Sequence, residues 1–184
     1  MPTDFPALKM ELYTADVGQQ GPPNVRITDT DPNQGPRMIF ASTQGWIQAP
    51  GASARQFADA GPNDPGLFTL GQMFCIGVTL INWNGNAWTS ARMVHISDPR
   101  SSMIKGNTYG FYSNANANYT AVDSNNLYVV ISSKGPYDKI RQVAEEVKSN
   151  LPNLRDDHIW AYMAVLGANI LGSAVSNDGY FGEP

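Results

Sequence analysis

The sequence has a single cysteine, Cys75, among its 184 residues. No intramolecular disulfide can form, so the fold must hold without covalent cross-links, and the thiol is compatible with a reducing compartment. Histidine is almost as scarce, since only His95 and His158 occur. One cysteine and two histidines cannot supply the usual ligand set of a zinc site, so the sequence predicts no metal.

Charged residues are also few, at 15% of the chain, and the 12 Lys and Arg residues are scattered. With a net charge of -4, the chain lacks the basic patch that a phosphate backbone requires, so we expect no nucleic-acid partner. Residues 1–13 carry an Asp and two Pro where a standard export signal would have basic residues and an apolar run. We therefore expect a cytosolic protein, or one secreted into a host cytosol by a route that needs no signal peptide.

One segment approaches membrane-spanning length, because residues 159–175 contain no charged side chain. Asn169 and Ser173, together with two glycines, interrupt its apolar character. This favours a strand followed by a polar loop in a protein core. We expect no membrane partner.

Glycine and proline are plentiful, with 17 and 13 residues, and 42% of the residues are hydrophobic. This composition is typical of a globular chain with many strands and turns, and its length fits one domain with a substantial core. We expect a single α/β (α+β) domain over residues 1–184, with a β-sandwich-like core of mixed strands flanked by helices. Turn formers dominate residues 1–36, which we expect to be a loosely attached extension, and residues 50–66 predict a long surface loop.

Periodicity marks a helix and a hairpin. Apolar residues after Pro136 recur at the spacing of one buried helical stripe, which predicts a helix over residues 136–151. Residues 68–82 are the most apolar part of the chain, and the turn signal Asn84-Gly85 is followed by a returning strand over residues 88–96. This hairpin would place Cys75 and His95 near the same open end.

Cys75 and His95 are the minimal equipment for covalent attack on a carboxamide or ester carbon. A thiol is mostly protonated at neutral pH, so it needs a nearby imidazole to favour the thiolate. The imidazole must be held in one tautomer through its other nitrogen, and Thr69 is a candidate for that role. Taken singly, each of the three residues also fits an ordinary core or strand position. His158 is a weaker candidate for a second catalytic imidazole.

The combined pattern of Thr69, Cys75 and His95 resembles the cysteine-histidine glutamine deamidases, a group that includes the chemoreceptor deamidase CheD, the catalytic domain of cytotoxic necrotising factor, and Burkholderia lethal factor. In CheD and the lethal factor a threonine also precedes the catalytic cysteine by six positions, and a histidine follows in an apolar strand. The segment MVHISDP around His95 is similar to the lethal-factor segment around its histidine.

A second similarity lies near the C-terminus. The predicted helix, a short loop and the segment AYMAVLGANIL resemble the end of CheD, with residues 167–169 in place of its glycine-rich loop. The likeness covers roughly residues 68–171 by order of elements. One departure is that Met73 and Phe74 stand where the relatives have small residues directly before the cysteine.

The resemblance implies a CheD-like fold and a protein glutamine deamidase with catalytic Cys75, His95 and Thr69. Such an enzyme converts an accessible glutamine of a protein substrate to glutamate through a thioester and needs no cofactor. We expect Met73, Phe74 and Trp88 to border the substrate cleft, together with the loop of residues 50–66. We expect a monomer, and the closer likeness to the lethal factor favours a bacterial toxin or effector.

Two alternatives stay open. A transglutaminase or a cysteine protease uses the same nucleophile and base; the spacing of twenty residues argues against papain-type proteases, whereas transglutamination differs only in the second nucleophile. The alternative from another class is a non-catalytic β-rich binding module, in which Cys75 is buried and Trp46, Trp83 and Trp88 form a recognition surface.

Overall fold

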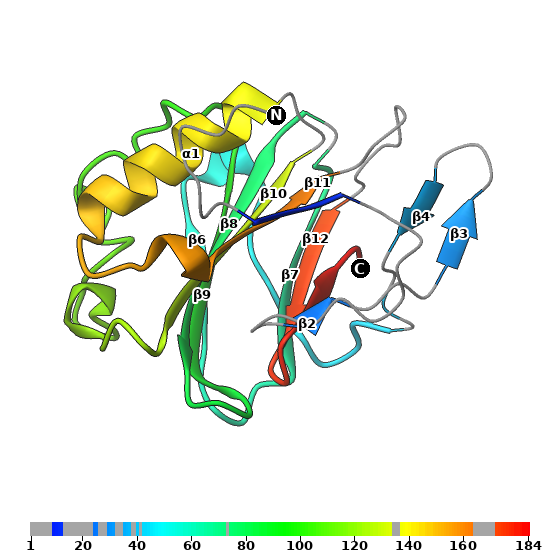
Figure 1. The fold of residues 1–184 in the computed structure, drawn as a ribbon, viewed down its shortest axis with the longest axis horizontal. Helices are drawn as coiled ribbons and strands as arrows, with labels where there is room; N and C mark the ends of the chain where they lie inside the picture. The colour runs from blue at the N-terminus through cyan, green and yellow to red at the C-terminus, as the bar shows by residue number, and fades with distance from the viewer. Residues whose placement is uncertain are drawn as a thin grey trace.

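The computed structural model describes residues 9–12, 24–25, 29–31, 35–37, 40, 42–72, 74–133, 137–163 and 172–184. Within these residues the chain forms two mixed β-sheets, a two-stranded ribbon and one α-helix. The fold is therefore α+β and consists mostly of strands, as the composition predicted at that level (Figure 1).

The larger sheet, sheet A, has six strands in the order β1-β11-β10-β8-β9-β6. Its strands are β1 Lys9–Leu12, β6 Phe57–Ala60, β8 Ile76–Trp83, β9 Trp88–Ile96, β10 Leu127–Ser133 and β11 Ile159–Met163. Strands β1, β11 and β10 run parallel to one another. Strands β10, β8, β9 and β6 pair in antiparallel fashion, which makes the sheet mixed.

The second sheet, sheet B, has five strands in the order β2-β13-β12-β7-β5. Its strands are β2 Asn24–Val25, β5 Ile47–Gln48, β7 Gly66–Leu70, β12 Gly172–Ser176 and β13 Tyr180–Gly182. The ribbon joins β3 Asp29–Asp31 to β4 Gly35–Arg37. Three short 3-10 helices, Ala52–Ala54, Tyr119–Ala121 and Asp156–His158, and the helix α1 Tyr137–Asn150 complete the described elements.

Sheet A is buried on both faces, so its central strands are almost continuously apolar, as strands covered on two sides must be. Alternate residues of β8, β9 and β10 pack under α1 and the segment of residues 97–126. The buried stripe of α1 is the one that its periodicity predicted, and it comprises Ile140, Val143, Ala144 and Val147. Figure 1 shows α1 across the outer face of sheet A, with sheet B on the opposite side.

The other face of sheet A packs against sheet B. Met93 and Val130 of sheet A belong to the same buried cluster as Leu67, Val175 and Phe181 of sheet B. Each of these large side chains contributes roughly 1.5–3 kcal/mol by leaving water. The two sheets thus form a sandwich whose apolar centre is shared between them.

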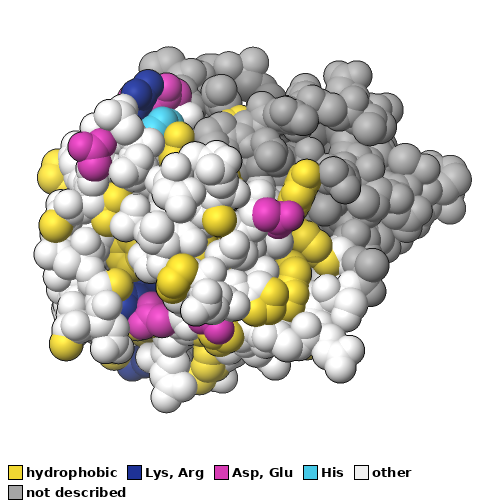
Figure 2. Space-filling model, turned by 90° about the horizontal axis from the view of Figure 1, so that it is seen from below, with side chains coloured by type: hydrophobic (Ala, Val, Ile, Leu, Met, Phe, Trp, Pro, Cys, Tyr) yellow, Lys and Arg dark blue, Asp and Glu magenta, His cyan; other side chains and the backbone are white. Residues whose placement is uncertain are grey.

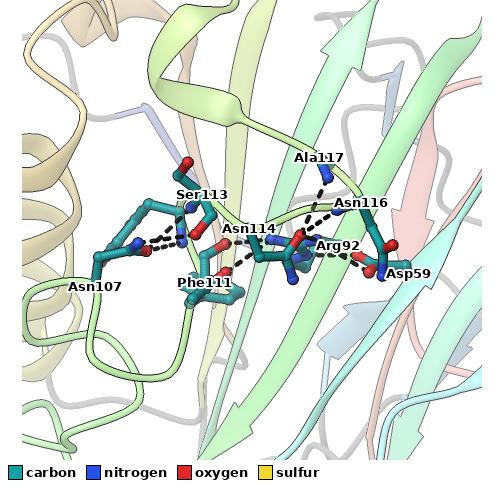
Figure 3. A network of polar contacts seen from close by, with 10 residues as sticks. Asp59, Arg92, Asn107, Phe111, Ser113, Asn114, Asn116 and Ala117 are labelled. Atoms are coloured by element: carbon teal, nitrogen blue, oxygen red, sulfur yellow. Dashed lines mark hydrogen bonds and ion pairs between the residues drawn. The ribbon is translucent and has the colours of Figure 1, made fainter.

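A buried arginine fixes the segment of residues 97–126 to sheet A (Figure 3). The Arg92 guanidinium donates to both carboxylate oxygens of Asp59, at 2.5 and 3.0 Å. It also donates to the carbonyl oxygens of Gly110 and Phe111 and to Oδ1 of Asn114, at 2.9 to 3.0 Å. The contacts to Gly110, Phe111 and Asn114 join the long connection between β9 and β10 to β9, and the contacts to Asp59 join β9 to the edge strand β6.

The structure corrects one sequence prediction and refines others. Residues 50–66 are not one long loop, because they contain a 3-10 helix and β6, which pairs with β9. Alanine and aspartate are weak strand formers, so β6 depends on this pairing and on the burial of Ala58 and Ala60. In the predicted extension of residues 1–36, β1 and β2 form the outer strands of sheets A and B.

The uncharged segment of residues 159–175 begins as β11 and ends in β12. No helix among the described residues is long and apolar enough to cross a membrane. Figure 2 views the end of the molecule that carries the turn between β8 and β9, and charged side chains on that face are few.

Candidate active site

The predicted hairpin of β8 and β9 is confirmed, and it brings Cys75 and His95 to the same end of sheet A. Gly77 lies directly opposite His95, and Ile76 lies opposite Ile96. Cys75 precedes β8 by one residue, so strand alternation places it on the face of Gly77 and His95. Cys75 and His95 are then diagonal neighbours, which in a regular antiparallel pair are roughly 7–8 Å apart and within reach of a long side chain.

Thr69 reaches His95 from the other sheet. Its hydroxyl oxygen lies 2.9 Å from Nδ1 of His95 and 3.0 Å from the carbonyl oxygen of Ala49. A threonine hydroxyl has one proton, and a carbonyl oxygen can only accept, so Thr69 donates to Ala49. The imidazole must then donate its Nδ1 proton to Thr69, which assigns His95 to the Nδ1-H tautomer.

The other ring nitrogen of His95 is an unpartnered acceptor. Nε2 is buried and makes no hydrogen bond within the described part of the chain. Burial lowers the pKa of His95 below its usual 6.5, because desolvation disfavours the imidazolium. His95 is therefore neutral at physiological pH, with a lone pair on Nε2 that can accept a proton.

His95 belongs to a polar layer between two apolar regions of the sandwich. In sheet A, Ser132, Gly77 and His95 lie side by side on three adjacent strands. In sheet B, Thr69 lies opposite Ser173 on the facing pair β7 and β12. All four polar side chains are buried. Buried polar groups are retained only where partners satisfy them, so this layer demands specific contacts.

Gln72 supplies those contacts at the centre of the layer. It is fully buried and donates from Nε2 to the backbone oxygen of Ser132 at 2.6 Å and to its hydroxyl at 3.0 Å. Its Oε1 accepts from the Ser173 hydroxyl at 2.7 Å. We call Thr69, Gln72, His95, Ser132 and Ser173 the inter-sheet polar cluster. Sequence reasoning missed Gln72, although a lone amide three residues before the cysteine in an apolar run was an available signal.

The rim beside Cys75 is apolar and exposed. Phe74, directly before Cys75 in the chain, is 71% exposed, whereas Leu70 alternates with the inward-facing Thr69 and so points to the outer face of sheet B. Lys139 at the start of α1 donates to the carbonyl oxygen of Phe74. Lys139 also borders an open hollow of about 500 Å³, whose other lining residues are Asp98, Pro99, Arg100, Asp138 and Gln142. Phe74 is thus placed where a substrate could touch it, whereas Met73 lies outside the described residues.

Trp88 does not lie at this site, which corrects its expected place at the substrate cleft. It sits at the opposite end of β9, beside the turn and opposite Trp83. It lies seven positions before His95 along β9, or about 23 Å away at the usual rise of a strand. It is 1% exposed, and its indole N-H donates to the carbonyl oxygen of Gly61 at 3.0 Å. Trp88 is a packing residue of the hairpin.

His158 is also remote from the cluster. Its Nδ1 lies 2.9 Å from the carbonyl oxygen of Leu127, and its ring stacks on Tyr128 with centroids 3.8 Å apart. These contacts fix the entry into β11 and leave the ring no part in the cluster. Among the described residues, no group of three His, Cys, Asp or Glu side chains is placed to hold a metal ion.

The arrangement brings a thiol, an imidazole and a threonine hydroxyl to the same end of the two sheets. A thiol, an imidazole with a vacant Nε2 and a threonine that holds Nδ1 can together perform acyl transfer through a thioester. A scan of protein-family models and a search of curated proteins each gave no match to this chain.

Proposed function

We propose that this chain is a protein glutamine deamidase in which Cys75 is the nucleophile, His95 the general base and acid, and Thr69 the residue that orients His95. The observation that carries the proposal is the chain of hydrogen bonds from His95 Nδ1 through Thr69 to the Ala49 carbonyl. These hydrogen bonds leave Nε2 as a buried acceptor. The ring lies on the face of sheet A to which strand alternation also points Cys75. An ordinary core histidine would have both nitrogens satisfied.

The first half-reaction forms a thioester. Nε2 of His95 takes the thiol proton of Cys75, and the sulfur attacks the side-chain amide carbon of a glutamine. The resulting tetrahedral oxyanion collapses as His95 passes its proton to the amide nitrogen, the C–N bond breaks and ammonia leaves. Thr69 keeps Nδ1 protonated throughout, so that Nε2 alone carries the transferred proton.

The second half-reaction restores the enzyme. Nε2 takes a proton from water, the hydroxide attacks the thioester carbon, and the C–S bond breaks with return of the proton to the Cys75 sulfur. The target residue is now glutamate, so the target gains one negative charge. Nε2 of His95 carries the proton transferred in each half-reaction, the carboxylic acid that forms loses its own proton to solvent, and no cofactor is required.

Two features support a folded protein as the substrate. The apolar side chain of Phe74, directly before Cys75 in the chain, is exposed and can contact the surface around a target glutamine. The order of α1 and β11 agrees with the C-terminal resemblance to CheD, and the local likeness of residues 93–99 to the lethal factor favours a toxin or effector that acts in a host cytosol.

The burial of the tryptophans disfavours a binding module that uses them for recognition. Trp83 and Trp88 are core residues, and Trp46 packs its ring over Gly66 and against Phe40. Trp83 and Trp88 offer no open aromatic face of the kind that dominates binding hot spots, and the half-buried Trp46 has one face against Gly66. Transglutamination shares the thioester and is separated from deamidation by the second nucleophile alone.

The test is a search for glutamines that gain one mass unit. The purified full chain is incubated with native lysates of bacterial and eukaryotic cells in the presence of methylamine, with Cys75→Ser as the matched control. We expect one glutamine of one protein to become glutamate with the wild type only. Methylamide at that glutamine would assign a transglutaminase instead, and equal conversion by the Cys75→Ser variant in both lysates would overturn the proposal.

A further inference from the structure

We propose that Gln72 is a positioning residue that holds the cysteine loop, of which the structure describes Gly71, Gln72, Phe74 and Cys75, in the reactive geometry against sheet A. The inference rests on the proposed function, since it concerns how Cys75 is presented to His95. Gln72 touches neither the thiol nor the imidazole through any hydrogen bond among the described contacts, so it acts through the backbone that connects it to Cys75.

The amide of Gln72 is held in one orientation. Its NH2 group faces the backbone carbonyl of Ser132, which can only accept, and its oxygen faces the hydroxyl of Ser173, which donates to it. Rotating the amide by half a turn would set two oxygens against each other at 2.6 Å. One side chain thereby joins the cysteine loop to β10 of sheet A and to β12 of sheet B.

The cysteine loop is fixed from the outside as well. Gly71 has φ of +71°, a left-handed conformation that suits glycine and turns the chain away from β7. On the solvent side, Lys139 donates to the carbonyl oxygen of Phe74, directly before the cysteine. The loop is therefore held at Gln72 inside the sandwich and at Phe74 on its surface, with Cys75 at the end of the held segment.

Gly77 provides the space that Gln72 occupies. A Cβ at position 77 would lie 3.2 Å from Oε1 of Gln72, and 2.6 and 2.4 Å from the hydroxyl oxygens of Ser132 and Ser173. Contacts below 3.0 Å require the neighbouring atoms to move. Because Gly77 has no side chain, the amide of Gln72 can lie directly above the strand pair that carries His95. The glycine at position 77 and the glutamine at position 72 therefore fit each other.

The experiment measures alkylation of Cys75 by iodoacetamide across pH in the full chain. The variants are Gln72→Met, Gln72→Glu and Ser173→Ala, with Gln44→Met in an exposed turn as the matched control. We expect Gln72→Met to lower the rate at neutral pH by on the order of tenfold to a hundredfold, the cost of misplacing a reacting group by about 1 Å. Ser173→Ala, which removes one of the three contacts, should lower the rate less, and Gln44→Met should leave it unchanged.

Gln72→Glu tests positioning separately from stability. A protonated carboxyl group can still donate to the Ser132 carbonyl and accept from Ser173, whereas a carboxylate cannot donate. The rate of this variant relative to wild type should therefore rise as the pH falls, while the relative rate of Gln72→Met stays flat. A residue that only stabilised the fold would change the melting temperature and leave both relative rates at one in the folded protein.

The outcomes separate the two proposals. If His95→Ala leaves the wild-type rate unchanged, the proposed function fails, whatever Gln72 does. If the rate depends on His95 but Gln72→Met and Ser173→Ala both react like wild type, the positioning role of Gln72 is overturned and the proposed function stands. Should Gln72→Met fail to fold, Ser173→Ala and the pH profile of Gln72→Glu still decide the question.

Discussion

Replacing Thr69 by valine removes a hydroxyl with almost no change of shape, so it tests the orientation of His95 directly. The hydroxyl makes two buried hydrogen bonds, to Nδ1 of His95 and to the carbonyl oxygen of Ala49. Each such bond contributes about 0.5–1.5 kcal/mol, and the two groups left behind are buried without partners. We expect Thr69→Val to lower the free energy of unfolding by roughly 2–4 kcal/mol.

The same change should cost reactivity beyond stability. Without the Thr69 acceptor, the imidazole of His95 no longer has a fixed Nδ1-H tautomer, and residues that orient a functional histidine typically contribute about 10- to 100-fold in activity. The assay is the rate of Cys75 alkylation by iodoacetamide, which is unambiguous because the chain has no other thiol. Urea unfolding of the same samples gives the stability.

Two variants act as controls. Thr69→Ser keeps the hydroxyl and should retain most of the wild-type rate, whereas Thr79→Val changes a buried threonine two residues beyond Gly77 on β8 and should leave the rate unchanged. If Thr69→Val alkylates as fast as wild type in the folded state, Thr69 does not orient His95, and the tautomer argument is refuted.

Three further predictions concern stability. Gly77→Ala forces a Cβ to within 2.4 Å of a serine hydroxyl and should destabilise the protein by about 1–3 kcal/mol in urea unfolding. An unchanged unfolding midpoint would show that the neighbouring polar side chains can move aside without cost. Burial lowers the pKa of His95 and of His158, so the unfolded state takes up protons first as the pH falls below 6.5. Stability should then decrease between about pH 7 and pH 5, by up to about 1.4 kcal/mol per pH unit for each histidine, and replacing both by Gln should reduce that slope if the assignment is correct. Asp59→Ala leaves the fully buried Arg92 without its carboxylate and should cost about 3–5 kcal/mol by thermal or urea unfolding; a loss below about 1 kcal/mol would contradict the anchoring role of that pair.

The sequence predicted the helix and the hairpin correctly, because each has a signal within a few consecutive residues. The stripe of Ile140, Val143 and Val147 marked α1, and the turn at Asn84-Gly85 marked the hairpin of β8 and β9. The register of that hairpin alone predicted that Cys75 and His95 lie at the same end of the sheet. Strand and helix periods are properties of a few consecutive residues, which is why they can be read from a single sequence.

The pairing of distant segments could not be predicted in this way. Sheet B joins β7 to β12, with Thr69 opposite Ser173, across about a hundred residues of chain. Nothing in the local pattern of either strand specifies that partner, and the same is true of β6, which has a weak strand composition and depends on β9. The position of Trp88 was misjudged because closeness in sequence to His95 becomes distance along an extended strand.

The site was predicted in its residue types but not in its chemistry. Thr69, Cys75 and His95 were chosen from spacing and resemblance, whereas the tautomer of His95 depends on the Ala49 carbonyl, which only the fold brings to Thr69. Gln72 was missed for a related reason. Its partners lie on β10 and β12, so its role becomes visible only when both sheets are in place.

The central claim is that His95 activates Cys75, and the most direct test is the alkylation rate of Cys75 at neutral pH in wild type, His95→Ala and the control His158→Ala. The account predicts that the folded wild type reacts with iodoacetamide faster than a free thiol such as N-acetylcysteine, that His95→Ala loses at least about tenfold, and that His158→Ala keeps the wild-type rate. A slow reaction that is indifferent to His95 would contradict the account and return Cys75 to an inert position at the edge of the core.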